Sequence, residues 1–291
     1  MNVLNLMMSF FMLQSGASIS CDTTAPIQYK TITTSLGDIA VQLKIIDKKP
    51  PILLLHGVYF DHHLWDYQVD KLTNYSTITI DMPLHGGSKA VKTKGWNLQD
   101  CAKMVLEILD QLELPQVIAI GHSWGSMTLL RAADLQPERF QALGFCNMPF
   151  KGSTPKIRSK FRFQHIVLGF RTFYTKQVAK ALFGKKILKD NPKLLAYLQQ
   201  SMGKLTAKEV RWTDKIAIID AEDASQKIRT LKVPTIALKG EEDYVAAPLQ
   251  LPLLMVKGGH VSPLEAKEDV LAFIFKVIAL GEQNDTTRVI K

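Results

Sequence analysis

The chain has 291 residues, 46% of them hydrophobic and 22% charged, an ordinary globular composition with enough apolar residues for a sizeable core. Its three scattered cysteines exclude a disulfide framework, and the lack of any Cys/His zinc-site spacing leads us to expect no structural metal. The formal net charge of +9 is compatible with nucleic acid, anionic lipid, an acidic substrate or solubility alone, so its distribution matters more than its sum.

The first thirteen residues, MNVLNLMMSFFML, form an apolar stretch that is too short to cross a bilayer. Small residues follow, with a suitable cleavage site between Ala17 and Ser18 and a poor lipoprotein site at Cys21. These features favour a signal peptide and an exported protein, whether secreted, periplasmic or membrane-associated. No Lys or Arg precedes Lys30, so the alternative stays open that residues 1–25 are an apolar extension of a cytoplasmic protein.

The next segments predict a sheet that opens with a hairpin. IQYKTITT and DIAVQLKIID alternate apolar and polar residues around a turn at 36–38. From Pro51 onward the apolar runs become short and unbroken, as is typical of strands buried on both faces of a parallel sheet. These runs are ILLLHG, STITIDM, VIAIGHS, ALGFCN, PTIALKG and LPLLMVKGGH.

Helical patterns separate the strand runs. We expect helices over residues 97–114, where Cys101 falls on the apolar face, over 126–140, and over 262–280 with Ser262 as its cap. The alternation of strands and helices predicts a mostly parallel, doubly wound α/β sheet with right-handed crossovers. Residues 150–215 lack strand runs, so we predict a helical insertion between core segments 26–149 and 216–291.

A serine lies between two glycines where the run 117–122 ends, in the sequence Gly121, His122, Ser123, Trp124, Gly125. Reactive groups in an open α/β sheet gather at the carboxyl ends of strands, and the pattern G-x-S-x-G there is typical of a nucleophile elbow. Such a short pattern also occurs by chance, but a buried strand before it and a helix after it favour Ser123 as a nucleophile.

A serine nucleophile needs a histidine base and an acid that orients it. Only His165 and His260 follow Ser123, and His165 falls inside the helical insertion. His260 follows a strand run on a Gly-Gly turn, the position that the order Ser, acid, His requires. We therefore expect His260 to be the base.

The strand run PTIALKG ends in EEDYVAAP, which offers Glu241, Glu242 and Asp243 as the acid. We choose Asp243, which lies deepest in the loop, and expect the two glutamates to face solvent. The other acid position, after the preceding strand, holds Asn147, which cannot supply a negative charge.

Backbone N–H groups are expected to bind the oxyanion. The Trp124 amide follows the nucleophile, and the Val58 amide follows His56-Gly57 at the end of a strand run. Tyr59 stays open as the rival of Val58. We expect His56 and His85 to shape their loops rather than to act in catalysis.

These motifs together resemble the α/β-hydrolase superfamily over residues 27 to 280. HG after a strand, DMPLHGGS (81–88, similar to D-x-P-G-H-G-x-S), GHSWGS, GEEDYVAAP and GGHVSPLE occur in the order of that family. The resemblance implies the α/β-hydrolase fold, a helical cap at residues 150–215 and hydrolysis through a serine-bound acyl intermediate without a cofactor. Leu84 departs from the pattern, which usually has glycine there.

The nucleophile narrows the activities that the resemblance implies. Haloalkane dehalogenases and epoxide hydrolases of similar length have Asp at the elbow, so Ser123 argues against both. Esterases, lipases, lactonases, carbon–carbon bond hydrolases and cofactor-free haloperoxidases remain, and cleavage of a small-molecule carboxylic ester is the broadest reading. A non-catalytic binder of small ligands and an acyltransferase stay open as alternatives.

The positive charge is concentrated in the cap. From Lys151 to Lys193 twelve Lys or Arg residues face a single acidic one, Asp190. Aromatic residues are interleaved with these cations: Phe161, Phe163, Phe170, Phe173, Tyr174 and Phe183. Such a segment is typical of an interfacial helix, which gives the hypothesis that the cap contacts an anionic membrane surface. The competing interpretation, a solvated basic exterior over an apolar pocket, is favoured by the pattern alone, because amphipathic helices cover any active site in this way. We expect no nucleic-acid partner, because no recognised binding motif accompanies the charge.

Overall fold

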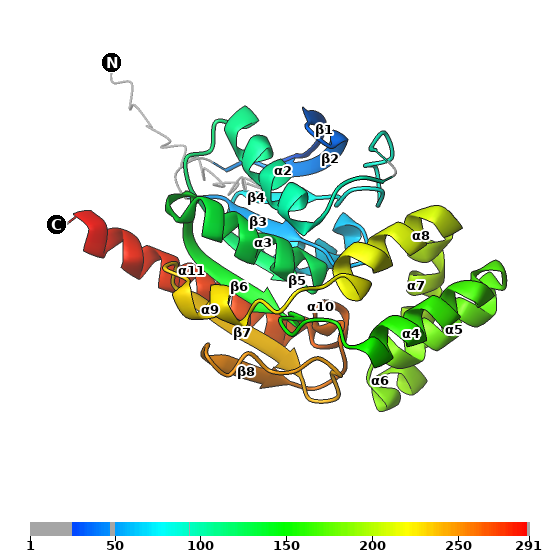
Figure 1. Ribbon diagram of the computed structural model, residues 1–291. Coiled ribbons are helices and arrows are strands. Elements are labelled where there is room, and N and C mark those ends of the chain that lie inside the picture. The colour runs from blue at the N-terminus through cyan, green and yellow to red at the C-terminus, as the bar shows by residue number, and fades with distance from the viewer. Residues whose placement is uncertain (1–24, 47–49, 93, 290–291) are drawn as a thin grey trace, which may run out of the picture.

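The computed structural model describes residues 25–46, 50–92 and 94–289. The expected signal peptide or apolar extension, including Cys21, lies outside the described residues apart from Ala25. Eight strands form one sheet in the order β1-β2-β4-β3-β5-β6-β7-β8 (Figure 1). Their bounds are β1 Ile27–Thr34, β2 Gly37–Lys44, β3 Ile52–Leu55, β4 Thr77–Ile80, β5 Val117–His122, β6 Phe140–Cys146, β7 Thr235–Gly240 and β8 Leu253–Val256.

The sheet has the predicted hairpin followed by a parallel region. β1 pairs antiparallel with β2, β2 pairs antiparallel with β4, and every further pairing from β4 to β8 is parallel. All residues of β3, β4, β5 and β6 are buried, because helices cover both faces of these central strands. The predicted α/β class with a doubly wound sheet is therefore confirmed.

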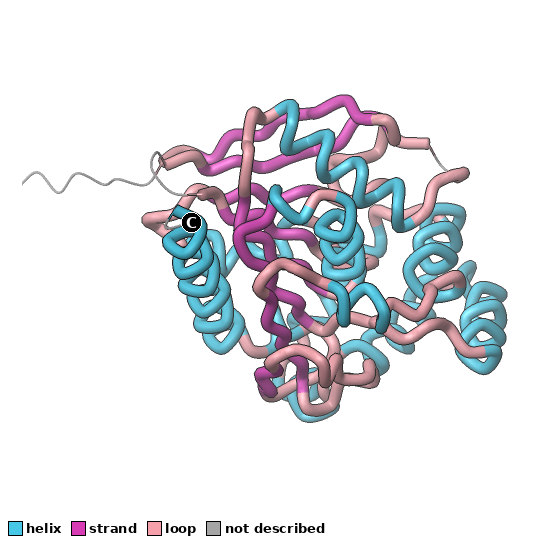
Figure 2. The backbone as a smooth tube through the Cα atoms, turned by 60° about the vertical axis from the view of Figure 1, so that its left-hand side comes forward, coloured by secondary structure: helices cyan, strands magenta, loops and turns pink. Residues whose placement is uncertain are grey.

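Two layers of helices enclose the sheet. One layer contains α1 Asp66–Lys71 and α11 Lys267–Val289, and the other contains α2 Leu98–Gln111, α3 Trp124–Leu135 and α9 Ser225–Thr230. In Figure 2 the helix that ends at the C-terminus lies on one side of the magenta strands and other helices lie on the opposite side. Asn97 caps α2 reciprocally with Asp100, and Cys101 lies on the buried face of that helix as expected.

A group of helices connects β6 to β7 and lies beyond the carboxyl ends of the parallel strands (Figure 1). They are α4 Pro155–Gln164, the 3₁₀ helix η3 His165–Gly169, α5 Arg171–Leu182, α6 Lys185–Asp190, α7 Lys193–Gly203, α8 Ala207–Asp214 and the π-helical turn η4 Lys215–Ile219. No helix in the described ranges combines the length and apolar character needed to cross a membrane.

The expected single helix over 262–280 is wrong in its first turn. The chain forms α10 Ser262–Glu265, breaks at Ala266 and then begins α11. Ser262 is not the cap: Val261 holds that position, and the Ser262 hydroxyl has no hydrogen-bond partner in the described structure. Glu265 instead accepts the amides of Gly184, Gly259 and Val261, so this segment secures the loop before it.

The expected helix over 126–140 also ends early. α3 stops at Leu135, because Pro137 begins a short 3₁₀ turn (η2 Pro137–Arg139) and Phe140 already belongs to β6. The remaining short element, η1 His62–Trp65, precedes α1 and contributes the buried Trp65 to the core.

Candidate active site

Ser123 lies in a strained turn between β5 and α3, with φ +50° and ψ −111°. A Cβ on Gly121 would lie 2.4 Å from the Ser126 nitrogen, and one on Gly125 would lie 2.4 Å from the Leu55 oxygen. Both distances are too short for real atoms, so the two glycines allow strand and helix to approach closely enough to make the turn. A backbone conformation of this kind costs about 1–3 kcal/mol and is held by the surrounding structure.

The structure brings Ser123, His260 and Asp243 together in one chain of hydrogen bonds. His260 Nε2 lies 2.9 Å from Ser123 Oγ, and His260 Nδ1 lies 2.9 Å from Asp243 Oδ1. All three side chains are buried. With the Nδ1 proton donated to the carboxylate, Nε2 is left as the acceptor for the serine proton.

Asp243 is held by more than the histidine. Asn147 Nδ2 donates to Oδ2 at 2.9 Å, and the Val245 amide donates to Oδ1 at 3.0 Å. Burial raises the pKa of Asp243, but the combined effect of His260, Asn147 and Val245 holds that pKa below its ordinary value. The carboxyl is therefore ionised at neutral pH.

Asn147 is a positioning residue that the sequence analysis missed. Its second bond, from Nδ2 to the Gly259 carbonyl at 3.2 Å, ties the acid loop to the loop of His260. Asn147 has φ +52°, a left-handed conformation that asparagine tolerates better than most residues. Its place at the end of β6, beside the acid-bearing strand β7, was the available signal.

The backbone of His260 is fixed from both sides. Its carbonyl accepts a hydrogen bond from His122 Nε2 at 2.7 Å, and its amide donates to the Leu182 carbonyl at the end of α5. Burial lowers the pKa of His122 to about 3, so this ring is neutral. His122, the variable residue of the G-x-S-x-G pattern, therefore positions the base.

The Tyr59 amide, rival donor for the oxyanion, already has an acceptor. It donates to His85 Nε2 at 3.1 Å, while His85 Nδ1 lies 3.0 Å from the Pro83 carbonyl, which fixes the tautomer. This leaves Val58 as the better candidate, and no acceptor for its amide is found in the described part of the chain. The Trp124 amide begins α3 and so has no intrahelical acceptor.

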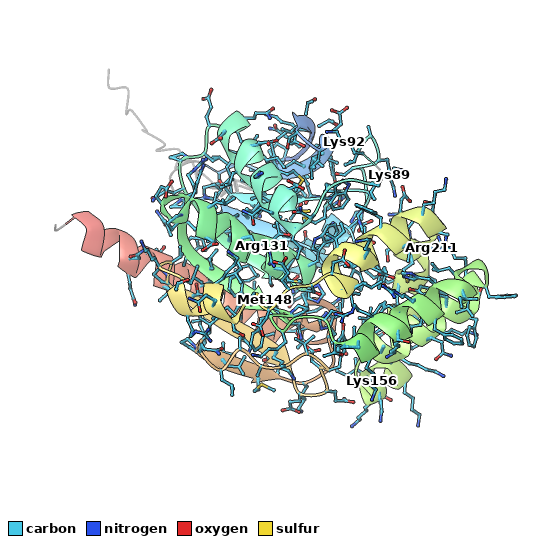
Figure 3. All side chains as sticks on the ribbon, viewed as in Figure 1. Lys89, Lys92, Arg131, Met148, Lys156 and Arg211 are labelled. Carbon is cyan, nitrogen blue, oxygen red and sulfur yellow. The ribbon has the colours of Figure 1, made fainter. Side chains whose placement is uncertain are left out.

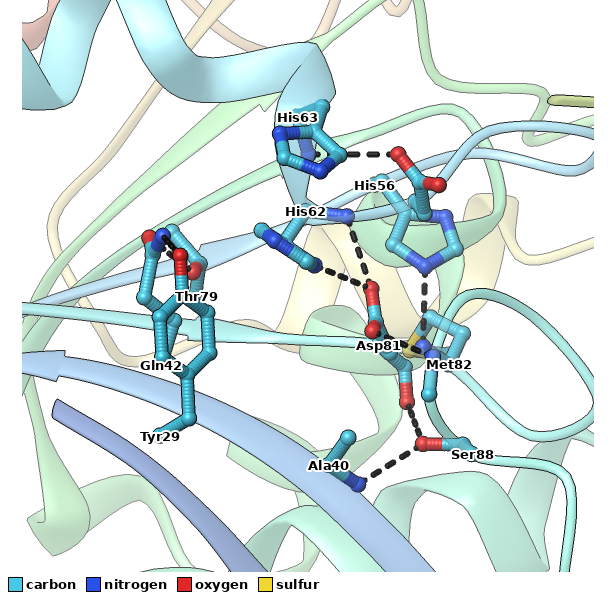
Figure 4. A network of polar contacts seen from close by, with 12 residues as sticks. Tyr29, Ala40, Gln42, His56, His62, His63, Thr79, Asp81, Met82 and Ser88 are labelled. Atoms are coloured by element: carbon cyan, nitrogen blue, oxygen red, sulfur yellow. Dashed lines mark hydrogen bonds and ion pairs between the residues drawn. The ribbon is translucent and has the colours of Figure 1, made fainter. Parts of the chain in front are cut away.

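His56 controls the direction of the Val58 amide. Its Nδ1 lies 2.8 Å from the Gly57 carbonyl. Its Nε2 accepts the Met82 amide at 2.8 Å, the contact drawn in Figure 4. The Gly57 carbonyl and the Val58 N–H belong to one planar trans peptide and point in opposite directions. Holding the carbonyl therefore holds the N–H as well.

The loop of residues 81–88 is anchored by Asp81 (Figure 4). Asp81 accepts the His62 amide at 2.7 Å and the Gly87 amide at 2.8 Å, and lies 2.9 Å from His62 Nδ1. Burial opposes ionisation, but these partners lower the pKa of Asp81 to about 2. Leu84 adopts a left-handed conformation, φ +72°, that glycine would adopt without strain, and its side chain is buried.

His165 begins η3 in the group of helices from α4 to η4, which we call the cap. It takes no part in the hydrogen bonds that join Ser123, His260 and Asp243. Its Nε2 is 2.9 Å from Oδ2 of Asp214, a fully buried residue at the end of α8. The Tyr59 and Tyr174 hydroxyls donate to the same carboxyl group. Burial raises the pKa of Asp214. The network fastens the cap to Tyr59, next to the candidate oxyanion donor.

Two apolar cavities, of about 280 and 300 Å³, lie between the cap and Tyr244. They share Lys160, Phe161, Ile218 and Tyr244, and the Tyr244 ring lies 4.9 Å from the His260 ring. A third cavity has a volume of about 480 Å³. None of the three cavities is lined by Ser123, Asp243 or His260 themselves; the first two adjoin the site through Tyr244, which does not line the third. Within the described ranges, no group of three or more His, Cys, Asp and Glu side chains could hold a metal ion.

The fold agrees with the comparisons to known proteins. The family model described as alpha/beta hydrolase fold matches residues 50–260, so the chain belongs to that family of hydrolases. The bifunctional epoxide hydrolase 2 of Sus scrofa is 31% identical over 111 residues, which cover 37% of this chain. The match spans only 20% of the length of that relative.

Solved structures match over more of the chain. An esterase from Thermogutta terrifontis is 20% identical, with a TM-score of 0.74 over 87% of this chain and 99% of that one. The enol-lactonase of Burkholderia xenovorans is 18% identical, with a TM-score of 0.74 over 87% of this chain and 100% of its own. At these identities the likeness shows the fold alone.

Proposed function

We propose that the protein is a serine hydrolase that cleaves a carboxylic ester, of esterase, lipase or lactonase type, through an acyl-enzyme intermediate. The observation that carries this proposal is the chain of 2.9 Å contacts from Ser123 Oγ through His260 to Asp243, at a strained strand-to-helix turn. The order and geometry are those of a nucleophile, a base and an orienting acid.

In the first half of the reaction, Ser123 Oγ attacks the ester carbonyl carbon while His260 Nε2 takes the serine proton. The negative charge on the carbonyl oxygen is stabilised by the Val58 and Trp124 amides, each donor contributing about 3 kcal/mol in comparable sites. When the tetrahedral intermediate collapses, the ester C–O bond breaks and His260 returns the proton to the leaving alcohol. Asp243 stays ionised and stabilises the imidazolium.

In the second half, water takes the place of the alcohol. His260 accepts a proton from the water as its oxygen attacks the acyl carbon, and then returns that proton to Ser123 Oγ as the acid leaves. The apolar cavities beside Tyr244 suit the hydrocarbon part of the substrate. No step needs a cofactor.

Hydrolysis of p-nitrophenyl esters from acetate to palmitate tests the proposal. Ser123→Ala is expected to lose activity on every ester that the wild type cleaves. Ser35→Ala, an exposed serine outside the site, is the matched control and is expected to keep it. Activity that survives in Ser123→Ala would refute Ser123 as the nucleophile. Added alcohols that divert the acyl group to a new ester would identify acyl transfer instead.

We also propose that the cap docks on an anionic lipid surface. Four large apolar side chains near η3 are exposed: Phe163 by 67%, Ile166 by 73%, Phe170 by 74% and Phe173 by 54%. The flanking helices carry cations and no acidic residue between Lys151 and Lys189. Apolar side chains that can enter the bilayer boundary, surrounded by cations that attract anionic headgroups, complement such a surface in both respects.

Co-sedimentation with vesicles tests this docking. Wild type is expected to bind phosphatidylglycerol vesicles and to be released by salt, with much weaker binding to phosphatidylcholine. Phe163→Ser with Phe170→Ser is expected to weaken binding by about tenfold or more. The control Leu249→Ser changes a side chain that is 83% exposed in the β7–β8 connection. Equal binding of both variants would contradict the docking surface.

A further inference from the structure

The cavity of about 480 Å³, which is lined by neither Ser123 nor Tyr244, has its own set of polar and aromatic walls. It is lined by the start of α2, by Arg131 of α3, and by Trp212 and Lys215 where α8 passes into η4. We refer to it as the Arg131 cavity. Its volume lies in the range that small-molecule sites occupy. Figure 3 shows Arg131 among the side chains over α3, whereas Lys156 and Arg211 lie on the cap.

Arg131 is a buried cation without a carboxylate partner. Arg131 is only 4% exposed. Its Nη1 donates to the carbonyl of Met127, one turn earlier in α3, at 3.0 Å. Within the described ranges, no carboxylate lies within ion-pair distance of its guanidinium. Glu222, which also lines the cavity, acts on it from farther away.

The other cations of the cavity are already compensated. Lys215 pairs with Asp220, and Lys227 pairs with Asp134. Arg131 is thus the lining cation left without an ion-pair partner, and of the five N–H groups of its guanidinium one donates to Met127. Burying a charge without a partner is costly, and burial indeed lowers the pKa of Arg131. An anion in the cavity would remove that cost.

Two further features of the walls favour an anion with a flat apolar body. The Trp96 and Trp212 rings meet edge to face, with centroids 6.2 Å apart, and Trp212 Nε1 is buried without an acceptor in the described structure. The first turn of α2 also faces the cavity through Asn97, Leu98 and Gln99. Asn97 accepts the amides of Gln99 and Asp100, so the Leu98 amide remains as a donor at the positive end of this helix.

We propose that the Arg131 cavity binds an organic carboxylate with a flat apolar body, as a site distinct from the one around Ser123. The guanidinium of Arg131 holds the carboxylate by two N–H bonds, as the planar geometry of both groups allows. The apolar body lies against the indoles of Trp96 and Trp212. This inference does not rest on ester hydrolysis.

Isothermal titration of the full chain with 2-naphthoate, and with its neutral isostere 2-naphthamide, tests the site. The wild type is expected to bind one naphthoate in this cavity at least about tenfold more tightly than the amide, because only the carboxylate pairs with Arg131. Equal binding of the two probes would overturn the proposal. So would a lack of any binding heat up to millimolar probe.

Variants locate the bound probe. Arg131→Gln is expected to weaken naphthoate about tenfold and to leave naphthamide unchanged. The matched control Lys160→Gln removes a cation from the cavities beside Tyr244 and is expected to change neither. A loss in Lys160→Gln instead of Arg131→Gln would place the probe in the cavities beside Tyr244 and refute the site. Trp212→Phe, expected to weaken both probes, gives a second test if Arg131→Gln fails to fold. Failure of these tests would leave the ester hydrolase proposal standing.

Discussion

Replacing Asn147 by glycine tests whether the acid of the site is held as the geometry indicates. The change removes two hydrogen bonds from Nδ2, one to Asp243 Oδ2 at 2.9 Å and one to the Gly259 carbonyl at 3.2 Å. Glycine accepts the left-handed conformation of residue 147, φ +52°, without strain, so the backbone itself need not change.

The size of the effect follows from the type of bond that is lost. A hydrogen bond to a charged group contributes about 1.5–3 kcal/mol, and each 1.36 kcal/mol changes a rate about tenfold. If that energy orients Asp243 in the transition state, kcat/KM of Asn147→Gly falls by about ten- to a hundredfold. Glu113→Gly is the matched control, since exposed Glu113 also has a positive φ, +55°, and lies outside the site.

The pH dependence of stability gives a second test of Asn147→Gly. The folded-state pKa of Asp243 lies below its ordinary value, so its contribution to stability is present above the unfolded pKa and is lost as pH falls through the folded one. Without Asn147 the folded pKa rises, and the acid limb of denaturation moves to higher pH. Steady-state assays and urea denaturation between pH 3 and 8 measure both effects. Wild-type kcat/KM together with an unmoved acid limb would refute the role of Asn147.

Three further predictions concern the elbow, the cap and the loop behind the site. Gly125→Ala places a Cβ 2.4 Å from the Leu55 oxygen and is expected to destabilise the fold by several kcal/mol in chemical denaturation. In the control Gly203→Ala the added Cβ meets nothing within 4 Å, so this variant should be neutral or stabilising by about 0.5–1 kcal/mol. Equal effects of Gly125→Ala and Gly203→Ala would contradict the close approach of α3 to β3. The folded-state pKa of Asp214 is raised, so the folded state favours its protonated form, and its contribution to stability is lost as pH rises through that pKa. Asp214→Asn should therefore reduce the fall of the unfolding free energy with rising pH in urea denaturation. An unchanged dependence of that free energy on pH would contradict this role of Asp214. His122→Ala removes the 2.7 Å bond to the His260 carbonyl and should lower kcat with little change in KM, whereas a pure KM effect would contradict a positioning role.

The sheet and the sites at its strand ends could be read from the sequence because their signals are local. Unbroken apolar runs mark the buried strands. Ser123 directly follows β5, and Asp243 and His260 lie in the loops that follow β7 and β8. In a parallel sheet the carboxyl ends of the strands meet at one edge, so three residues far apart in the chain come together without any knowledge of packing.

The features that the sequence did not predict depend on contacts between segments that are distant in the chain. Ser262 and Glu265 fit a capping box locally, yet Glu265 is drawn to the amides of Gly184 and Gly259, and the helix breaks at Ala266. The choice between the Val58 and Tyr59 amides likewise depends on His85, 26 residues from Tyr59, which accepts the Tyr59 amide. The sequence indicates only that Asn147 cannot be the acid, because the position of its amide group beside Asp243 arises from the pairing of β6 with β7.

Labelling with a fluorophosphonate, followed by intact mass and peptide mapping, tests the central proposal most directly. An activated serine attacks the phosphorus and displaces fluoride, so the account predicts one adduct per chain, on Ser123, formed much more slowly when His260 is replaced by alanine. Folded wild-type protein that takes up no label, or takes it up on another serine, would contradict the proposal that Ser123 is the nucleophile of a serine hydrolase.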